Sequence, residues 1–279
     1  MSAGTEIVEH RSGTVRARKS VECEPERAWN AWTDPRLLAQ WFTDDARGEA
    51  RVGETLTWIW KDFDLEIPQQ VLVAEAGERL VLEGPAPGAG RQLLEVRFRA
   101  EGGHTLVDVI NSGFPEAEEF RSIVRDAESG WHLALAVFKQ YVEAHLGSDC
   151  RRFFVQRSVP FEFEDLVPFY RREAELARWL TRSGEIGDEA EPYRLELRDG
   201  RSMHGRVLAR SEREVALSWD ELGGVVELKA FAAGAEARVI ATRATLWAAD
   251  AEQARAAESL FTESLERLAT ALRDGAASG

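Results

Sequence analysis

Cysteine is scarce in this chain of 279 residues, where only Cys23 and Cys150 occur, one in each half. Two cysteines so far apart predict no disulfide framework, and the expected location is a reducing cytoplasm. The five histidines show no metal-ligand spacing and have no cysteine ligands nearby, so no metal site and no cofactor are expected. Glycine-rich phosphate loops and serine nucleophile motifs are also missing, and the motifs therefore assign no catalytic residue.

Basic residues are outnumbered, with 35 Lys and Arg against 49 Asp and Glu, and the net charge is −14 at pH 7. Because a nucleic-acid surface needs clustered Lys and Arg, we expect no nucleic-acid partner. No apolar run approaches the roughly 20 residues that cross a bilayer, and the first residues lack the pattern of a signal peptide. We therefore expect no membrane insertion.

The most informative positive feature is a repeat. Residues 39–43, Ala-Gln-Trp-Phe-Thr, are a near copy of residues 177–181, Ala-Arg-Trp-Leu-Thr. Further matched positions follow in the same order: Val71 with Val207, Val107 with Val239, and residues 128–131 with 258–261. The offset shrinks in small steps, as expected when a second copy loses loop residues but keeps its core. The sequence predicts two domains, residues 1–147 and 148–279.

Each copy shows the same order of patterns. In the first, residues 14–21 predict a strand, 24–42 two short helices, 51–109 an antiparallel meander with period two, and 116–142 a long helix with an apolar stripe. Residues 84–90, rich in Pro and Gly, predict a loop. In the second, residues 153–159, 163–180, 193–228 and 251–272 repeat this plan. The predicted class is α+β: two tandem domains, each a curved antiparallel sheet wrapped on a long C-terminal helix.

Residues 25–29, 33–35, 38–42, 112–114 and 130–131 carry a family resemblance: Pro-Glu-Arg-Ala-Trp, Thr-Asp-Pro, Leu-Ala-Gln-Trp-Phe, Ser-Gly-Phe and Gly-Trp. With these motifs the first copy resembles the activator of heat-shock protein 90 ATPase homologue 1-like family of the START-like (SRPBCC) superfamily. The resemblance implies a helix-grip domain with a cavity between sheet and helix that often holds an apolar small molecule. The second copy looks diverged, because it has Leu260-Phe261 in place of Gly-Trp.

Side chains on the predicted concave strands and the facing helix are the candidates for lining such a cavity. The ligand-binding candidates are Trp58, Trp60, Leu94, Val96, Phe98, Val107, Val109, Trp131, Leu135 and Phe138. For any single ring the alternative is that it simply fills the core, as aromatic stripes at regular spacing usually do. The first copy has more large aromatic residues on these strands than the second, so we expect the cavity there.

Asp62, Asp64 and Glu66 alternate with apolar residues, which predicts three carboxylates on one side of an extended segment. Hard cations bind such oxygen clusters, but a solvated strand edge that resists aggregation explains the pattern more simply.

Three functions are compatible with these observations. The leading hypothesis is a non-catalytic START-like protein that binds an apolar small molecule in its first domain. The alternative is a chaperone-accessory or protein-interaction module, which predicts an exposed apolar patch and a chaperone or other protein partner. The third is a cyclase- or hydratase-like enzyme, which requires polar side chains with perturbed pKa inside the cavity.

Overall fold

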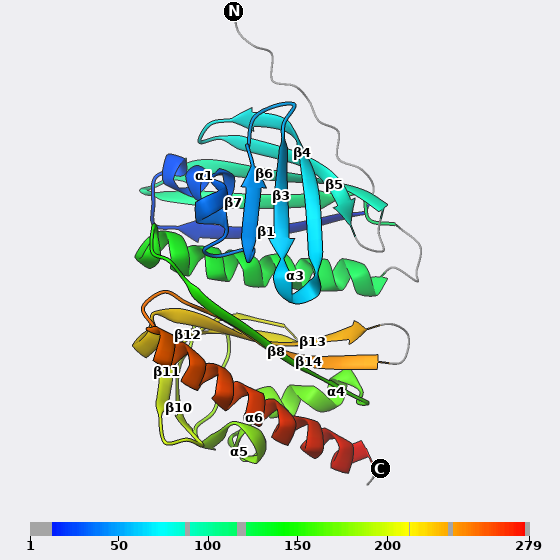
Figure 1. The fold of residues 1–279 in the computed structure, drawn as a ribbon, viewed down its shortest axis with the longest axis vertical. Helices are drawn as coiled ribbons and strands as arrows, with labels where there is room; N and C mark the ends of the chain where they lie inside the picture. Colours follow the sequence, from blue (N-terminus) through cyan, green and yellow to red (C-terminus); the bar gives the residue numbers. More distant parts are fainter. Residues whose placement is uncertain (1–12, 87–89, 116–120, 212, 234–236, 277–279) are drawn as a thin grey trace, which may run out of the picture. The chain divides into compact units, whose positions relative to one another are not determined.

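The computed structural model describes residues 13–86, 90–115, 121–211, 213–233 and 237–276. The chain divides into two compact units, Met1–Gly147 and Ser148–Gly279 (Figure 1). Each unit contains one seven-stranded antiparallel sheet and one long helix near its end. Among the described residues no helix has the length and apolar character needed to cross a membrane.

The first unit has the strand order β1-β7-β6-β5-β4-β3-β2. Its long helix α3 packs along β1, the edge strand of the sheet (Figure 1). In chain order its elements are β1 (Thr14–Val21), α1 (Pro25–Thr33), α2 (Pro35–Leu38), β2 (Asp45–Gly48), β3 (Thr55–Trp60), η1 (Lys61–Phe63), β4 (Leu65–Glu75), β5 (Arg79–Ala86), β6 (Gly90–Glu101), β7 (His104–Ser112), α3 (Arg121–Gln140) and the π-helical turn η3 (Tyr141–His145).

The second unit has the order β8-β14-β13-β12-β11-β10-β9, which is the same topology. Its closing helix α6 packs on β8 and on α5 (Figure 1). The elements are β8 (Arg151–Val159), α4 (Phe163–Leu166), η4 (Val167–Tyr170), α5 (Glu173–Trp179), β9 (Thr181–Ser183), β10 (Pro192–Leu197), β11 (Ser202–Arg210), β12 (Glu214–Trp219), η5 (Asp220–Leu222), β13 (Gly224–Ala233), β14 (Ala237–Leu246) and α6 (Ala251–Ala276).

The repeat extends to local detail. The pairing of β4 with β5 shifts between Val71 and Val73, and the pairing of β11 with β12 shifts between Val207 and Ala209. A bulge thus lies at the same place in both sheets, at the residues that the sequence repeat aligns. The predicted α+β class, with two tandem helix-grip domains, is confirmed.

The matched tryptophans also make matched hydrogen bonds. Trp41 Nε1 donates to the carbonyl of Ala31 at 2.9 Å, and Trp179 Nε1 donates to the carbonyl of Phe169 at 2.9 Å. Each bond spans ten residues: the first ties the turn after α2 to α1, and the second ties the end of α5 to η4. Both indoles are buried, as expected for residues that pack the core at equivalent positions.

The short helices of the first unit bring two aromatic residues over the sheet. Pro35 begins α2, and the Asp34 side chain caps it by accepting the backbone N–H of Arg36 at 2.9 Å. The turn that follows α2 places Trp41 in the core and leaves Phe42 half-buried. The start of α2 at Asp34 and Pro35 therefore helps to position Phe42, which lines the pocket of this unit.

The long helix of the first unit follows the predicted stripe over the described residues. Leu135, Phe138 and Val142 are at most 1% exposed, and Trp131 is half-buried. The predicted start of this helix, with Phe120 and the acidic residues from Glu116, lies outside the described residues.

Two expectations for the loops of the first unit are wrong. Residues 61–64 are not extended: Trp60 pairs with Leu65 across a hairpin, and η1 with Asp64 at φ +47° closes it. Asp64 occupies the left-handed region, which Asp tolerates better than most residues, so the alternation of carboxylates does not reflect a pleat. Glu66 on β4 forms an ion pair with Arg47 on β2, across the intervening strand β3.

Residues 84–86 and Gly90 belong to strands and not to the predicted loop, because β5 continues to Ala86 and β6 begins at Gly90. Pro85 is tolerated there for a physical reason. The pairing of β4 with β5 ends at Gln70 and Glu83, so beyond that point β5 pairs with β6 alone and Pro85 needs no N–H for β4.

Candidate functional site

A pocket of about 220 Å³ lies between the sheet and α3 of the first unit. Five strands, the helix and the turn after α2 contribute to it: Trp58 and Trp60 from β3, Ile67 and Gln69 from β4, Gly84 and Pro85 from β5, Gln92 and Leu94 from β6, Asn111 from β7, Trp131 from α3, and Phe42. The volume exceeds the about 150 Å³ that accommodates benzene in an engineered apolar cavity. It is below the about 300 Å³ at which pockets for drug-sized ligands begin.

Phe42 is the centre of the aromatic wall. Its ring meets Trp58 edge-on at 5.1 Å and Trp60 at 5.4 Å, and it stacks on Trp131 at 5.6 Å between ring centroids. Trp58 and Trp60, two residues apart on one face of β3, also meet edge-on at 6.2 Å. Each contact contributes about 0.5–1.5 kcal/mol beyond area burial, so these rings form a connected apolar side of the pocket.

The polar side of the pocket consists of neutral amides. Trp131 Nε1 donates to Asn111 Oδ1 at 3.1 Å, and Asn111 Nδ2 donates to the carbonyl of Leu93 at 3.1 Å and to Gln92 Oε1 at 3.3 Å. This chain of hydrogen bonds links α3 through β7 to β6 across the end of the pocket. None of the described residues at the wall is charged, so the pocket holds no titratable group for acid–base chemistry.

Two buried N–H groups of the wall have no hydrogen-bond partner. They are the indole Nε1 of Trp58 and the amide Nε2 of Gln92. The buried indole nitrogens of Trp32 and Trp219 also lack a partner, but neither residue lines this pocket. An unpaired buried donor costs about 1–3 kcal/mol, which makes its coincidence with a pocket informative.

A glycine makes room for the third amide. A Cβ on Gly84 would lie 2.3–2.7 Å from the terminal atoms of Gln69, so the absent side chain leaves the space that the Gln69 amide occupies. Gln69 is 7% exposed, and both residues line the pocket. The volume of the pocket therefore depends on this close approach.

The structure brings together four of the ten residues that the sequence proposed for the cavity, namely Trp58, Trp60, Leu94 and Trp131. The other six lie in the packed core and do not line this pocket: Val96, Phe98, Val107, Val109, Leu135 and Phe138. Phe98, for example, packs edge-on against Trp29 at 5.8 Å, and Phe138 contacts Trp41 at 4.9 Å. Ligand binding by the four remains a prediction.

The amides Gln69, Gln92 and Asn111 at the pocket wall are not among the residues predicted from the sequence. The strand pattern could have indicated two of them. Gln92 lies on the same inward-facing side of β6 as Leu94, and Asn111 on β7 pairs directly with Leu94. A polar residue at an inward strand position marks either a bulge or a cavity, and this pattern locates the polar end of the pocket.

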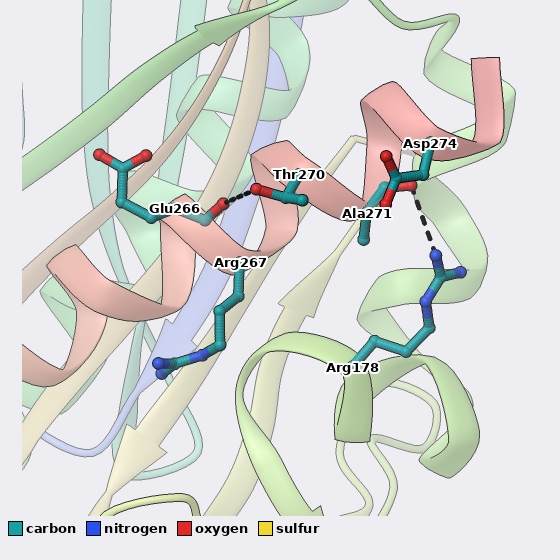
Figure 2. Close-up of a pocket in the computed structure, with 6 residues that line it drawn as sticks. All are labelled: Arg178, Glu266, Arg267, Thr270, Ala271 and Asp274. Carbon is teal, nitrogen blue, oxygen red and sulfur yellow. Dashed lines mark hydrogen bonds between the residues drawn. The ribbon is translucent and has the colours of Figure 1, made fainter. Parts of the chain in front are cut away.

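The second unit has a larger and shallower groove, of about 430 Å³, between α5 and α6. Figure 2 shows its lining residues, with Arg178 directed at the carbonyl of Ala271. Arg178 also pairs with Glu175 at 2.8 Å, and Arg267 donates to the carbonyl of Trp179 at 2.9 Å. Because both guanidinium groups are used to connect α5 and α6, the groove is explained by packing of the two helices.

Between the sheet and α6 of the second unit the corresponding positions are filled. Phe261, which the repeat aligns with Trp131, is fully buried and contacts Phe153 at 6.0 Å and Trp219 at 6.3 Å. Leu180, which aligns with Phe42, is also fully buried. The first unit, which has the pocket, thus carries the larger aromatic residues Phe42 and Trp131 where the second unit has Leu180 and Phe261.

A family model described as Activator of Hsp90 ATPase homolog 1-like protein matches residues 22–143, a range that lies within the first unit. No curated protein matches the sequence.

Several solved structures are similar at low identity. DynU16, a putative protein in the dynemicin biosynthetic locus, is 17% identical, with 94% of this chain and 99% of that chain covered and a TM-score of 0.42. CalU16 from Micromonospora echinospora is 21% identical over 47% of this chain and 76% of its own, with a TM-score of 0.40. The Aha1 dimer from Colwellia psychrerythraea is 18% identical over 48% of this chain and 98% of its own, with a TM-score of 0.43. At these TM-scores the fold assignment depends on strand order and on the family match.

Proposed function

Because the first unit belongs to the activator of Hsp90 ATPase homologue 1-like family of START-like proteins, we propose that it binds a small apolar molecule in the pocket between its sheet and α3. The observation that carries this proposal is the pocket of about 220 Å³ with an aromatic wall built from Phe42, Trp58 and Trp131. Its size fits one or two fused rings.

The second unit then has a supporting role in this proposal. Its sheet and helix enclose large buried side chains at the positions that match the pocket, including Phe261 and Trp219. A filled interior favours stability over ligand binding.

The two other functions have less support. An acid–base enzyme needs titratable groups at the reacting centre, and the described wall of the pocket has none. A protein-docking module needs a contiguous apolar patch, whereas the large exposed apolar residues among those described are Val52 and Phe63, which precede and follow β3 at its opposite ends.

Indane, a neutral bicyclic hydrocarbon, is a suitable probe of the binding function. We expect the full chain to bind it with a dissociation constant of about 1 mM or tighter, measured by saturation-transfer NMR and calorimetry. Ile67→Trp should abolish binding because the larger side chain fills the pocket. Ile59→Trp is the matched control, since Ile59 faces the other side of β3 from Trp58 and Trp60. A folded wild-type protein that does not bind indane would contradict the proposal.

Gly84→Ala tests the same pocket by a smaller change. The new methyl group displaces the Gln69 amide, and together they take volume from the pocket, so we expect the indane affinity to fall about threefold to tenfold. Because the atoms that must move are the end of a flexible side chain, the free energy of unfolding should change by less than about 1 kcal/mol. Calorimetric titration and urea unfolding check both parts. Unchanged affinity would show that indane binds elsewhere.

A further inference from the structure

We propose that the pocket selects a neutral aromatic ligand with a carbonyl-type acceptor oxygen, which accepts hydrogen bonds from Trp58 Nε1 and Gln92 Nε2. The inference rests on the proposed binding function and adds the chemical class of the ligand. Aryl ketones, lactones and quinones of one or two rings belong to this class.

The orientation of the Gln92 amide follows from its neighbours. An indole N–H can only donate, so the bond from Trp131 fixes Asn111 Oδ1 as the acceptor and Asn111 Nδ2 as the donor. Nδ2 donates to the carbonyl of Leu93, which can only accept, and to Gln92 Oε1. Gln92 Nε2 is therefore the end of the amide that remains unpaired, and it is a donor.

Trp58 supplies a second donor from the opposite part of the sheet. Trp58 is 5% exposed and lines the pocket, and its Nε1 has no hydrogen-bond partner. Both nitrogens are buried, so a side-chain rotation is needed to bring either N–H to a ligand atom. The terminal torsion of glutamine is soft, and such a rotation costs little compared with the about 1–3 kcal/mol of an unpaired buried donor.

The wall also restricts the charge of the ligand. It contains amides, aromatic rings and aliphatic side chains, and no described cationic residue that could pair with a carboxylate. Moving an unpaired carboxylate into such a pocket carries a large desolvation penalty. A neutral carbonyl oxygen has two acceptor positions and needs no counter-charge, so it suits two N–H donors.

Indane and 1-indanone provide a direct test, because the two bicyclic compounds differ in one carbonyl group. We expect the wild-type full chain to bind 1-indanone about tenfold more tightly than indane, and indane-1-carboxylate more weakly than either. Trp58→Phe and Gln92→Leu should each reduce the 1-indanone to indane affinity ratio about threefold to tenfold. Gln70→Leu is the matched control for Gln92→Leu. Gln70 lies on the face of β4 that points away from the pocket, where its amide donates to the carbonyl of Glu54, so this substitution should leave the 1-indanone to indane affinity ratio unchanged.

NMR identifies the donors themselves. With ¹⁵N-labelled protein, 1-indanone should shift the Trp58 indole N–H and Gln92 side-chain amide signals downfield more than indane does. Equal affinity for indane and 1-indanone in the wild type, or a ratio that survives both substitutions, would overturn the inference and leave the binding function intact. If neither compound binds to the folded protein, the proposed function fails, and the inference fails with it.

Discussion

Replacing Trp41 by alanine is expected to lower the free energy of unfolding of the first unit by about 4 kcal/mol. The indole is 3% exposed, lies 5.0 Å from Trp32 and 4.9 Å from Phe138 between ring centroids, and donates to the carbonyl of Ala31. The truncation leaves a cavity among these rings and an unpaired buried carbonyl. Small domains have only about 5–15 kcal/mol of stability, so this is a large share.

The repeat makes this prediction sharper, because Trp179→Ala should have an effect of similar size in the second unit. Trp179 is fully buried, contacts Tyr170 at 6.2 Å and makes the matching bond to the carbonyl of Phe169. Val52→Ala is the control, since Val52 is 58% exposed and should change stability by less than about 0.5 kcal/mol. Urea unfolding of the full chain, with hydrogen exchange to locate the loss, measures all three. A cost below about 1 kcal/mol for either tryptophan would contradict the packing role.

The second large effect concerns Glu95 on the outer face of the first sheet. Its carboxylate is 1% exposed, and Oε1 accepts from Arg79 Nε at 2.6 Å and from Arg97 Nε at 2.7 Å. Glu95→Ala leaves the mostly buried Arg79 guanidinium without this carboxylate, so we expect a loss of about 3 kcal/mol. Glu101→Gln, which removes a 58% exposed carboxylate from the same strand, should cost less than about 0.5 kcal/mol.

The same carboxylate predicts a dependence of stability on pH. Burial by itself raises the pKa of Glu95, but hydrogen bonds from Arg97 and Arg79 and their charges outweigh it, so the pKa in the folded state is lowered. Burial likewise raises the pKa of Asp108, but hydrogen bonds from Arg16 and Arg18 outweigh it, so the net effect is a lowered pKa. A carboxylate with a lowered folded pKa stabilises the fold above its unfolded pKa of about 4, and this stability is lost as the pH falls through the folded pKa.

The pH dependence of urea unfolding can therefore isolate the contribution of Glu95 to stability. Between about pH 5 and pH 2 the wild-type urea midpoint should fall more steeply than that of Glu95→Gln, which has no carboxylate to protonate at this position. The two curves should converge at the acid end. Parallel curves over the whole range would show that Glu95 titrates in the folded state as it does in the unfolded chain.

The repeat and the strand plan could be predicted because they depend on local regularities. Trp41 and Trp179 are embedded in similar short segments, and alternation along β3 and β6 places Leu56 and Val96 in the core, where both are fully buried. Such periodicities can be recognised directly from the order of apolar and polar residues in the sequence. Turns are harder, as Asp64 shows: its alternation with apolar neighbours has the period of a strand, although the hairpin closes there.

The pocket could be predicted only in part, because a cavity forms where packing fails to fill space. Val96, Phe98 and Leu94 belong to one inward-facing series on β6, yet only Leu94 reaches the pocket. The difference depends on what faces each residue, such as Trp29 against Phe98, and no periodicity contains that information. The amide of Gln92 is significant only once Asn111 and Trp131 are seen to fix its orientation.

A crystal structure of the full chain grown with 1-indanone would show directly whether the pocket of the first unit binds this ligand. We expect density for the bicyclic ring between Phe42, Trp58 and Trp131, with its carbonyl oxygen within hydrogen-bond distance of Trp58 Nε1 and Gln92 Nε2. A closed, densely packed interior at these side chains, with the compound bound elsewhere or not at all, would contradict it.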